Sequence, residues 1–247
     1  MPYSTVIYAK DGHIGRITLN RPEAGNAVNR ALAQELAAVC DRINHDDDVY
    51  VAVITGAGDG AFCRGREPGS SELFSVTAPV AGIDRPVVVA INGDAMGQGL
   101  ELALSGDLRI ASSRARFGLP EVGEGLIPMD GGTQRLPRVV GRAKALELVL
   151  TAETISAEEA LAIRLVNKVV SPEALAAEVD AVIQAVVTKG PIALRYAKEA
   201  VNKGLDLTLE QGLRLESDLY FLLHTTADRT EGIRAFREKR PPQFKGQ

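Results

Sequence analysis

Two runs of β-branched residues constrain the fold of this chain more than any other feature. Val51–Ile54 and Val87–Ile91 are continuous apolar runs that lack the alternation of a strand with one face in solvent. Strands of that kind are buried on both faces, as in the parallel sheet of an α/β protein. Leu108–Ala111 is a shorter run of the same type. The sequence therefore predicts an α/β core.

Other patterns place further elements around these runs. Thr5–Ala9 and Ile14–Asn20 are expected to pair as strands, with a turn at Asp11-Gly12 between them. An amphipathic helix is predicted from Val28 onward, because apolar residues recur there every three or four positions. After about residue 140 the pattern changes to successive helices. Capping patterns at Ser156–Glu159, Asp228–Glu231 and Ser171-Pro172 mark three of their N-termini.

Charge and composition exclude several classes of protein. The 247 residues carry a net charge of −4, without a basic stripe to contact phosphates, so we expect no nucleic-acid partner. The sequence has neither a leader-like apolar stretch nor a run of about 18 apolar residues, which predicts a cytoplasmic protein with no membrane partner. Cys40, Cys63 and the three histidines show no metal-ligand spacing, so we expect no metal.

A glycine-rich turn between a buried strand and an apolar helix is the first candidate functional segment. In residues 91–104, the turn around Gly97 and Gly99 brings backbone N–H groups to a helix N-terminus, where they can face an anion or a developing oxyanion. The segment does not match the dinucleotide-binding pattern G-x-G-x-x-G, because Leu102 stands in place of the third glycine, so we expect no Rossmann site. Glu101 lies among apolar helix residues, which indicates either a functional carboxylate or a first-turn acid that favours the helix dipole.

Two further segments have the character of functional loops. Residues 117–136 are rich in glycine and proline and carry three acids among apolar neighbours, too apolar a composition for disorder. Residues 58–69 directly follow the buried strand Val51–Ile54, where α/β sheets place ligands.

Together these segments resemble the enoyl-CoA hydratase/isomerase (crotonase) superfamily from one end of the chain to the other. The resemblance rests on Ile17–Ala27, on Ala61–Arg66, on the glycine-rich turn before Glu101, on Gly131–Arg138 and on Glu231–Phe236. It implies a crotonase-like spiral of ββα units. It also implies an α/β core over residues 1–190 and a C-terminal helical oligomerisation region over 191–247. The expected assembly is a homotrimer or a dimer of trimers.

The resemblance also implies an active site for an acyl-CoA substrate, with coenzyme A as part of the substrate and no bound cofactor. The backbone N–H groups of Arg66 and Gln98 would hold the thioester oxygen. Glu101 would activate water and Glu121 would protonate Cα, in roles that exchange on reversal. The expected coenzyme A contacts are Glu23, Ala24, Asn26, Arg64, Phe236 and Lys239.

Four residues depart from the family's pattern near this site. Gln98 interrupts a turn of small residues, where a positive φ would be costly and a long side chain could enter the pocket. Arg66 replaces an alanine, and its guanidinium faces either the pocket or solvent. Glu124 and Asp130 are possible additional acids, although Asp130 is better explained as a cap of the Gly131 or Gly132 N–H group.

Three functions are consistent with these residues. The leading hypothesis is an enoyl-CoA hydratase that adds water across the 2,3 double bond through an oxyanion-stabilised enolate. The alternatives are an enoyl-CoA double-bond isomerase of the same superfamily and a non-catalytic acyl-CoA-binding protein.

Overall fold

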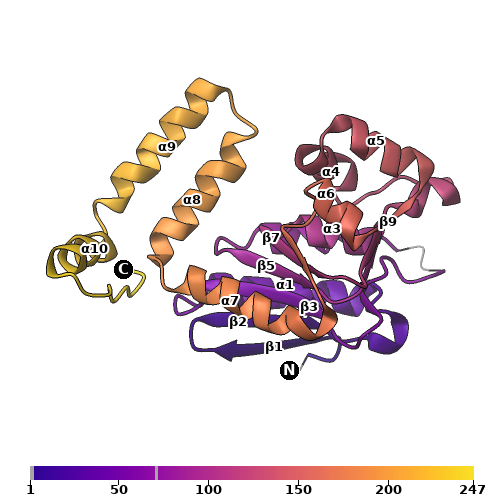
Figure 1. Ribbon diagram of the computed structural model, residues 1–247, viewed down its shortest axis with the longest axis horizontal. Coiled ribbons are helices and arrows are strands. Elements are labelled where there is room, and N and C mark those ends of the chain that lie inside the picture. Colours follow the sequence, from indigo (N-terminus) through magenta and orange to yellow (C-terminus); the bar gives the residue numbers. More distant parts are fainter. Residues whose placement is uncertain (1–2, 70–71) are drawn as a thin grey trace.

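The computed structural model describes residues 3–69 and 72–247, which form two β-sheets with surrounding helices (Figure 1). The larger sheet has the strand order β1 (Val6–Asp11), β2 (Ile14–Leu19), β3 (Val51–Gly56), β5 (Val87–Ile91), β7 (Leu108–Ser112) and β10 (Lys168–Val170). The smaller sheet has the order β4 (Ala61–Cys63), β6 (Asp94–Met96), β8 (Arg116–Gly118) and β9 (Thr154–Ser156). β1 and β9 are each antiparallel to their neighbour, and the other neighbouring strands are parallel.

Helices follow the strands in a regular pattern. They are α1 (Arg30–Asn44), α2 (Thr77–Ala81), α3 (Gln98–Leu104), α4 (Gly132–Val140), α5 (Arg142–Thr151), α6 (Ala157–Ala162), α7 (Leu175–Val187), α8 (Pro191–Gly204), α9 (Leu209–Leu223) and α10 (Ala227–Glu238), with 3-10 turns η1 (Pro22–Ala24), η2 (Pro120–Glu124) and η3 (Pro172–Ala174). From β3 to η2, a strand of the larger sheet is followed three times by a strand of the smaller sheet and then by a helical element. This repetition confirms the expected ββα units.

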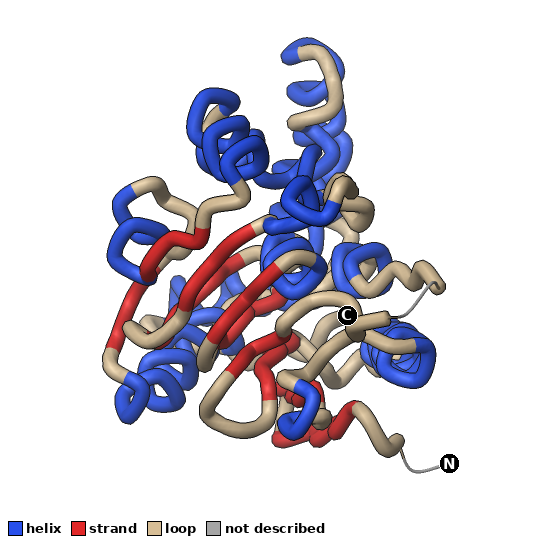
Figure 2. The backbone as a smooth tube through the Cα atoms, turned by 90° about the vertical axis from the view of Figure 1, so that its right-hand side faces the viewer, coloured by secondary structure: helices blue, strands red, loops and turns tan. Residues whose placement is uncertain are grey.

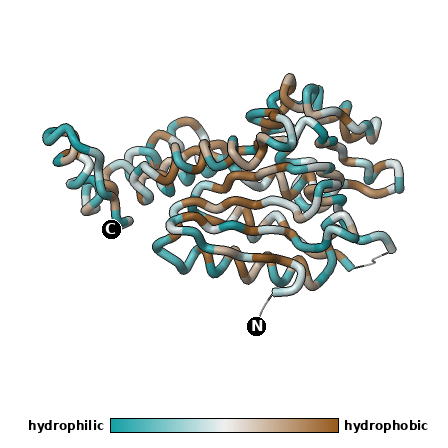
Figure 3. The backbone as a smooth tube through the Cα atoms, turned by 60° about the horizontal axis from the view of Figure 1, so that its bottom comes forward, coloured by the Kyte–Doolittle hydropathy of each residue, from teal (hydrophilic) through white to brown (hydrophobic). Residues whose placement is uncertain are grey.

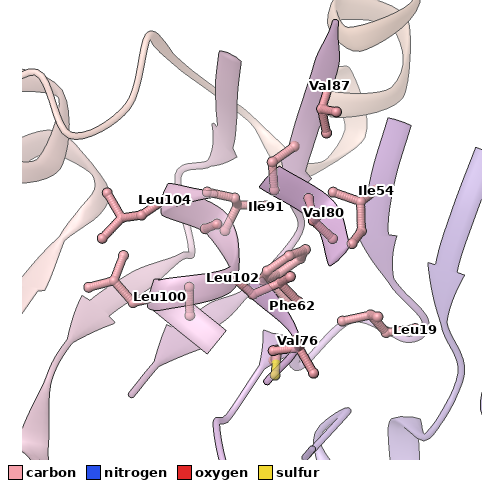
Figure 4. Close-up of a cluster of buried hydrophobic side chains, with 14 of the residues drawn as sticks. Leu19, Ile54, Phe62, Val76, Val80, Val87, Ile91, Leu100, Leu102 and Leu104 are labelled. Atoms are coloured by element: carbon pink, nitrogen blue, oxygen red, sulfur yellow. The ribbon is translucent and has the colours of Figure 1, made fainter. Parts of the chain in front are cut away.

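Burial on both faces explains the apolar runs that dominate the sequence. Val51, Val53 and Val88 face α7, which covers one side of the larger sheet. Ile54 and Val87 face the other side, where they pack with α2, α3 and the smaller sheet (Figure 4). The layers are visible in Figure 2, with helices on both sides of the strands. Figure 3 shows that these strands are hydrophobic over much of their length.

Some boundaries differ from the sequence prediction. Val28 lies outside α1 and forms an isolated parallel bridge with Arg66, while the Asn29 side chain caps the helix by accepting from the Leu32 N–H at 3.0 Å. The predicted capping box at Asp228 is wrong, because α10 begins two residues earlier with Thr226 as N-cap. The capping box at Ser156 is confirmed. Two short strands, β9 and β10, interrupt the region predicted to be helical throughout.

The last three helices lie at the opposite end of the molecule from α3, α4 and α5 (Figure 1). Helix α8 is joined to the core by polar contacts, since Lys198 Nζ lies 2.7 Å from an Asp107 carboxylate oxygen and donates to the Arg85 carbonyl at 2.9 Å. Helices α8 and α9 nevertheless expose large apolar side chains, among them Val201, Leu205, Leu209, Leu213 and Phe221. No helix in the described ranges is both long and apolar enough to cross a membrane.

Because α3 packs closely on β4, we expect any side chain at position 99 to destabilise the protein. A Cβ at Gly99 would lie 1.9 Å from the Cys63 carbonyl oxygen, whereas one at Gly60 would meet nothing within 4 Å. We expect Gly99→Ala to lower the free energy of unfolding by about 3 kcal/mol, through overpacking. The matched control Gly60→Ala should stay within about 0.5 kcal/mol of the parent in urea denaturation. Equal stability of the two variants would contradict this packing.

Candidate active site

Glu101 is a buried carboxylate held by two backbone N–H groups. It lies in the first turn of α3 with a relative exposure of 1%. Its Oε1 atom accepts from the Asp130 N–H at 2.8 Å and from the Gly132 N–H at 2.6 Å. A Cβ at Gly132 would lie 2.9 Å from that oxygen, so glycine is needed for the approach. Its Oε2 atom is buried without a hydrogen-bond partner among the described residues.

Glu121 approaches the same region from the η2 turn. Its Oε1 atom would lie 2.9 Å from a Cβ at Gly97, which has a φ of 52° and therefore favours glycine on two grounds. Its Oε2 atom is buried and has no partner within the described part of the chain. Both glutamates line one cavity of about 500 Å³. The expected convergence of Glu101 and Glu121 through the tertiary fold is therefore present. Glu101 does lie in the first turn of α3, but its burial exceeds what a first-turn acid needs to favour the helix dipole.

Burial shifts the ionisation of both acids in the same direction. Desolvation is the largest cause that raises the pKa of Glu101 to about 7, and the charges of Glu121 and Asp130 add to it against the two N–H bonds. The pKa of Glu121 is raised chiefly by burial and further by Glu124, while the Arg66 guanidinium opposes the shift. Near neutral pH the pair can therefore hold one proton and one negative charge, which is what combined acid and base catalysis requires.

Arg66 and Gln98, the two expected backbone donors, line this cavity from adjacent segments. In the bridge, the Val28 N–H donates to the Gly65 carbonyl at 2.7 Å and the Glu67 N–H donates to the Val28 carbonyl at 2.9 Å. This parallel pattern turns the Arg66 N–H away from Val28. Gln98 is the first residue of α3, where a helical N–H has no intrahelical acceptor.

Gly65 allows the two donor segments to approach each other. It has a φ of 87°, and a Cβ there would lie 2.8 Å from the Met96 carbonyl oxygen and 3.2 Å from the Gln98 nitrogen. Arg66 and Gln98 both line the cavity that contains the two glutamates. The arrangement can therefore present two donors to one oxygen atom, the geometry of an oxyanion hole.

Gln98 is accommodated in the glycine-rich turn without backbone strain. Gln98 is not among the residues with positive φ, so the anticipated strain is absent at this position. Its side chain is turned to neighbouring polar groups, with Nε2 donating to the Phe74 carbonyl at 2.5 Å and to Asp130 Oδ2 at 3.0 Å. These side-chain contacts do not involve the backbone N–H group of Gln98.

Asp130 and Glu124 differ in their surroundings. The Asp130 carboxylate accepts from the Val76 N–H at 2.8 Å and from the Ser75 hydroxyl at 2.7 Å, so the predicted capping of Gly131 or Gly132 is wrong. Burial opposes the ionisation of Asp130, but hydrogen bonds led by Ser75 and Gln98 hold its pKa below the usual value. An ionised carboxylate that is engaged in this way is a poor proton carrier. Glu124 is exposed at the rim of the cavity.

The expected coenzyme A contacts fall into two groups. Glu23 and Ala24 lie in η1, next to Gly25, whose carbonyl accepts from the Arg64 N–H at 3.0 Å. Because Arg64 also lines the active-site cavity, these residues form a continuous surface with it. Phe236 and Lys239 lie at the end of α10, far from α3 within one chain (Figure 1). Phe236 instead lines a separate cavity of about 470 Å³.

Asn26 has a structural role that its sequence position did not indicate. Its side chain is fully buried, accepts from the Arg21 N–H at 2.9 Å and donates to the carbonyls of Ala57 and Ala61, both at 3.0 Å. A direct contact of this side chain with a ligand is therefore excluded, and Asn26 instead fixes the loop that carries Glu23 and Ala24.

The described residues provide no metal site and no reactive thiol in this cavity. Within residues 3–69 and 72–247, no group of three or more His, Cys, Asp or Glu side chains could hold a metal ion. Cys63 is fully buried in β4, and desolvation raises its pKa to about 12. This agrees with its interpretation as a small buried hydrophobe.

A fold of repeated ββα units that brings two glutamates, Arg66 and Gln98 to one cavity defines a protein of the crotonase type. The model of the family described as "Enoyl-CoA hydratase/isomerase" matches residues 9–247. The chain belongs to this family.

Relatives of known name and structure are similar over nearly the whole chain. Crotonyl-CoA hydratase of Syntrophomonas wolfei is 39% identical over 99% of both chains. (E)-benzylidenesuccinyl-CoA hydratase of Thauera aromatica is 40% identical over 95% of this chain and 96% of its own. The crystal structure of enoyl-CoA hydratase from Bacillus anthracis covers 99% of this chain and 100% of its own, with 37% identity and a TM-score of 0.95.

The raised pKa of Glu101 predicts a pH-dependent cost in stability. A carboxyl group whose folded-state pKa is about 7 binds its proton more tightly than in the unfolded chain, so its stabilising contribution is complete at low pH and is lost as the pH rises through 7. We expect the stability of Glu101→Gln, relative to the parent, to increase by about 2–3 kcal/mol between pH 4.5 and pH 8. Urea unfolding at several pH values measures this difference.

The exposed Glu210→Gln is the matched control for that series. A relative stability of Glu101→Gln that stays constant with pH would show that Glu101 ionises as an ordinary exposed glutamate does.

Proposed function

We propose that this chain hydrates the 2,3 double bond of an enoyl-CoA thioester. The observation that supports this most directly is a pair of carboxylates in one cavity with Arg66 and Gln98, each with a buried Oε2 atom that has no hydrogen-bond partner among the described residues. Coenzyme A is part of the substrate and not a resident cofactor. We place the reaction in the cytoplasm.

The proposed oxyanion hole consists of the N–H groups of Arg66 and Gln98. Attack at Cβ moves electron density onto the thioester oxygen, and donors that are already in place stabilise that charge without reorganisation. One such donor is typically worth a factor of about 10²–10³ in rate.

The two glutamates then carry out the two proton transfers of the addition. Glu101 takes a proton from water as the oxygen forms its bond to Cβ, and Glu121 delivers a proton to Cα as the enolate collapses. The proton gained by Glu101 must return to Glu121 before the next turnover. Burial raises the pKa of both acids in the free chain, and the proposed roles require that Glu101 is ionised and Glu121 carries the shared proton when water attacks.

The two alternative functions have less support. An isomerase moves a proton with a single acid. Here each glutamate has one oxygen without a hydrogen-bond partner in residues 3–69 and 72–247, and the carboxylate of Asp130 is engaged by hydrogen bonds. A non-catalytic binding protein was suggested by Gln98 and Arg66. However, both positions act through the backbone, and the Gln98 amide is turned toward Phe74 and Asp130.

We further propose that residues 191–247 form the oligomerisation region of a homotrimer or a dimer of trimers. The exposed apolar side chains of α8 and α9 support this, because monomers rarely expose so many large hydrophobic residues in neighbouring helices. Such an assembly could bring Phe236 and Lys239 of one chain to the acyl-CoA site of its neighbour.

Single replacements of the two glutamates separate their roles. Glu101→Gln and Glu121→Gln should each lower kcat for crotonyl-CoA hydration by about 10²–10⁴, measured by loss of the absorbance of the conjugated thioester. In heavy water, Glu101→Gln should still exchange the Cα hydrogens of butyryl-CoA, because Glu121 serves Cα, whereas Glu121→Gln should not. Mass spectrometry measures this exchange.

Different outcomes of that experiment reject different parts of the proposal. If Glu121→Gln exchanged the Cα hydrogens and Glu101→Gln did not, the roles assigned to the two acids would be reversed. Hydration that persists in either variant would reject the two-carboxylate assignment. Conversion of 3-enoyl-CoA to 2-enoyl-CoA by a parent chain that leaves crotonyl-CoA unchanged would favour the isomerase.

The proposed assembly predicts a mass of three or six times that of the 26.3-kDa chain in light scattering. Phe221→Asp in α9 should lower that mass, because a charge would have to be buried in the apolar contact. The matched control Glu210→Gln, on the same helix, should leave it unchanged. A monomeric parent chain would reject the trimer.

A further inference from the structure

We propose that Asp130, clamped by Gln98, is a positioning residue for the carboxylate of Glu101. The inference rests on the proposed function, since it assigns a role within the same site. Its basis is a closed ring of contacts. Asp130 donates its backbone N–H to Glu101 Oε1 at 2.8 Å, and Gln98 donates Nε2 to Asp130 Oδ2 at 3.0 Å. Gln98 and Glu101 lie in the same turn of α3, which closes the ring.

The Asp130 side chain fixes this ring to a distant part of the chain. It is 7% exposed. Its carboxylate accepts from the Ser75 hydroxyl at 2.7 Å, from the N–H groups of Val76 and Thr77 at 2.8 and 3.2 Å, and from the Thr77 hydroxyl at 2.9 Å. The backbone N–H that holds Glu101 is therefore set by the start of α2 rather than by a mobile loop. A loop free to move could not maintain the sub-ångström placement that acid–base catalysis needs.

Capping of α2 alone does not account for these contacts. A cap would use the N–H groups of Val76 and Thr77, yet Gln98 also reaches Asp130 from α3 and contacts the Phe74 carbonyl at 2.5 Å. The same Gln98 supplies its backbone N–H to the proposed oxyanion hole. The cluster thus links the base, one oxyanion donor and the segment before α2 in one rigid unit.

Asp130 also acts on Glu101 through its charge. The charges of Glu121 and Asp130 both add to the desolvation that raises the pKa of Glu101. The Arg135 guanidinium also reaches this cluster, where it donates to the Asp130 carbonyl at 3.0 Å. Asn at position 130 can reproduce the hydrogen bonds, because its oxygen can accept from the N–H donors while its amide donates to the hydroxyls of Ser75 and Thr77. Asp130→Asn therefore removes the charge and keeps the geometry, whereas Asp130→Ala removes both.

The experiment measures kcat, KM and the pH profile of crotonyl-CoA hydration by the full chain. We expect Asp130→Ala to lower kcat about 10²-fold with KM within about 2-fold, because only the placement of Glu101 is lost. Asp130→Asn should keep kcat at pH 8 within about 3-fold, and the acid limb of its pH profile should move to lower pH.

Gln98→Met should lower kcat about 10-fold. Gln134→Met, an exposed glutamine whose amide contacts Thr133, is the matched control and should match the parent.

Three results would overturn the positioning role. They are a parental kcat in Asp130→Ala, a change confined to KM, and an equal loss in Asp130→Ala and Asp130→Asn with an unmoved acid limb. If Asp130→Ala fails to fold, Gln98→Met answers the question, since it removes one side-chain amide and leaves the other bonds of Asp130. A parent chain inactive on crotonyl-CoA would reject the hydratase proposal itself, whereas an active parent with an equally active Asp130→Ala rejects the positioning role alone.

Discussion

The hydrogen bonds from two backbone N–H groups to the Glu101 carboxylate are the interaction on which the rest of the site depends. A carboxylate at 1% exposure is costly unless it is paired or protonated, and among the described residues Glu101 finds hydrogen-bond partners for one of its oxygens only. The partnered oxygen fixes the side chain, and the bare oxygen retains its reactivity. This division explains why Gly132 must lack a side chain, and why burial can raise the pKa without displacing the group.

The two-sheet architecture brings the parts of the site together. β4, β6 and β8 are parallel neighbours, so their carboxyl ends meet at one edge of the smaller sheet. The segment after β4 carries Arg66, the segment after β6 carries Gln98 and Glu101, and the segment after β8 carries Glu121. Each ββα unit therefore contributes one part of the site. The larger sheet, buried on both faces, supplies the rigid support.

Sequence patterns predicted the buried strands and singled out Glu101 because both leave strong local signals, whereas Glu121 was proposed from the resemblance to the family. Apolar runs without alternation have few explanations, and a glutamate among leucines is conspicuous. The smaller sheet was missed because its strands are three residues long, too short for a period-two pattern to show. The role of Asp130 was also missed, because its partners Ser75 and Thr77 are more than 50 residues away and only the fold brings them together.

The unusual residues of the turn show why a backbone-based site tolerates side-chain change. An N–H group remains whatever side chain the residue carries, provided that φ and the direction of the side chain are compatible. Gln98 meets both conditions through its helical position and its contacts with Phe74 and Asp130. In the proposed mechanism, stabilisation of the enolate is thus independent of which side chains positions 66 and 98 carry. The preference for one acyl group over another must then arise where side chains line the cavity, as Leu73, Ile127 and Met129 do. Substrate range can therefore change within this family while the enolate chemistry stays the same.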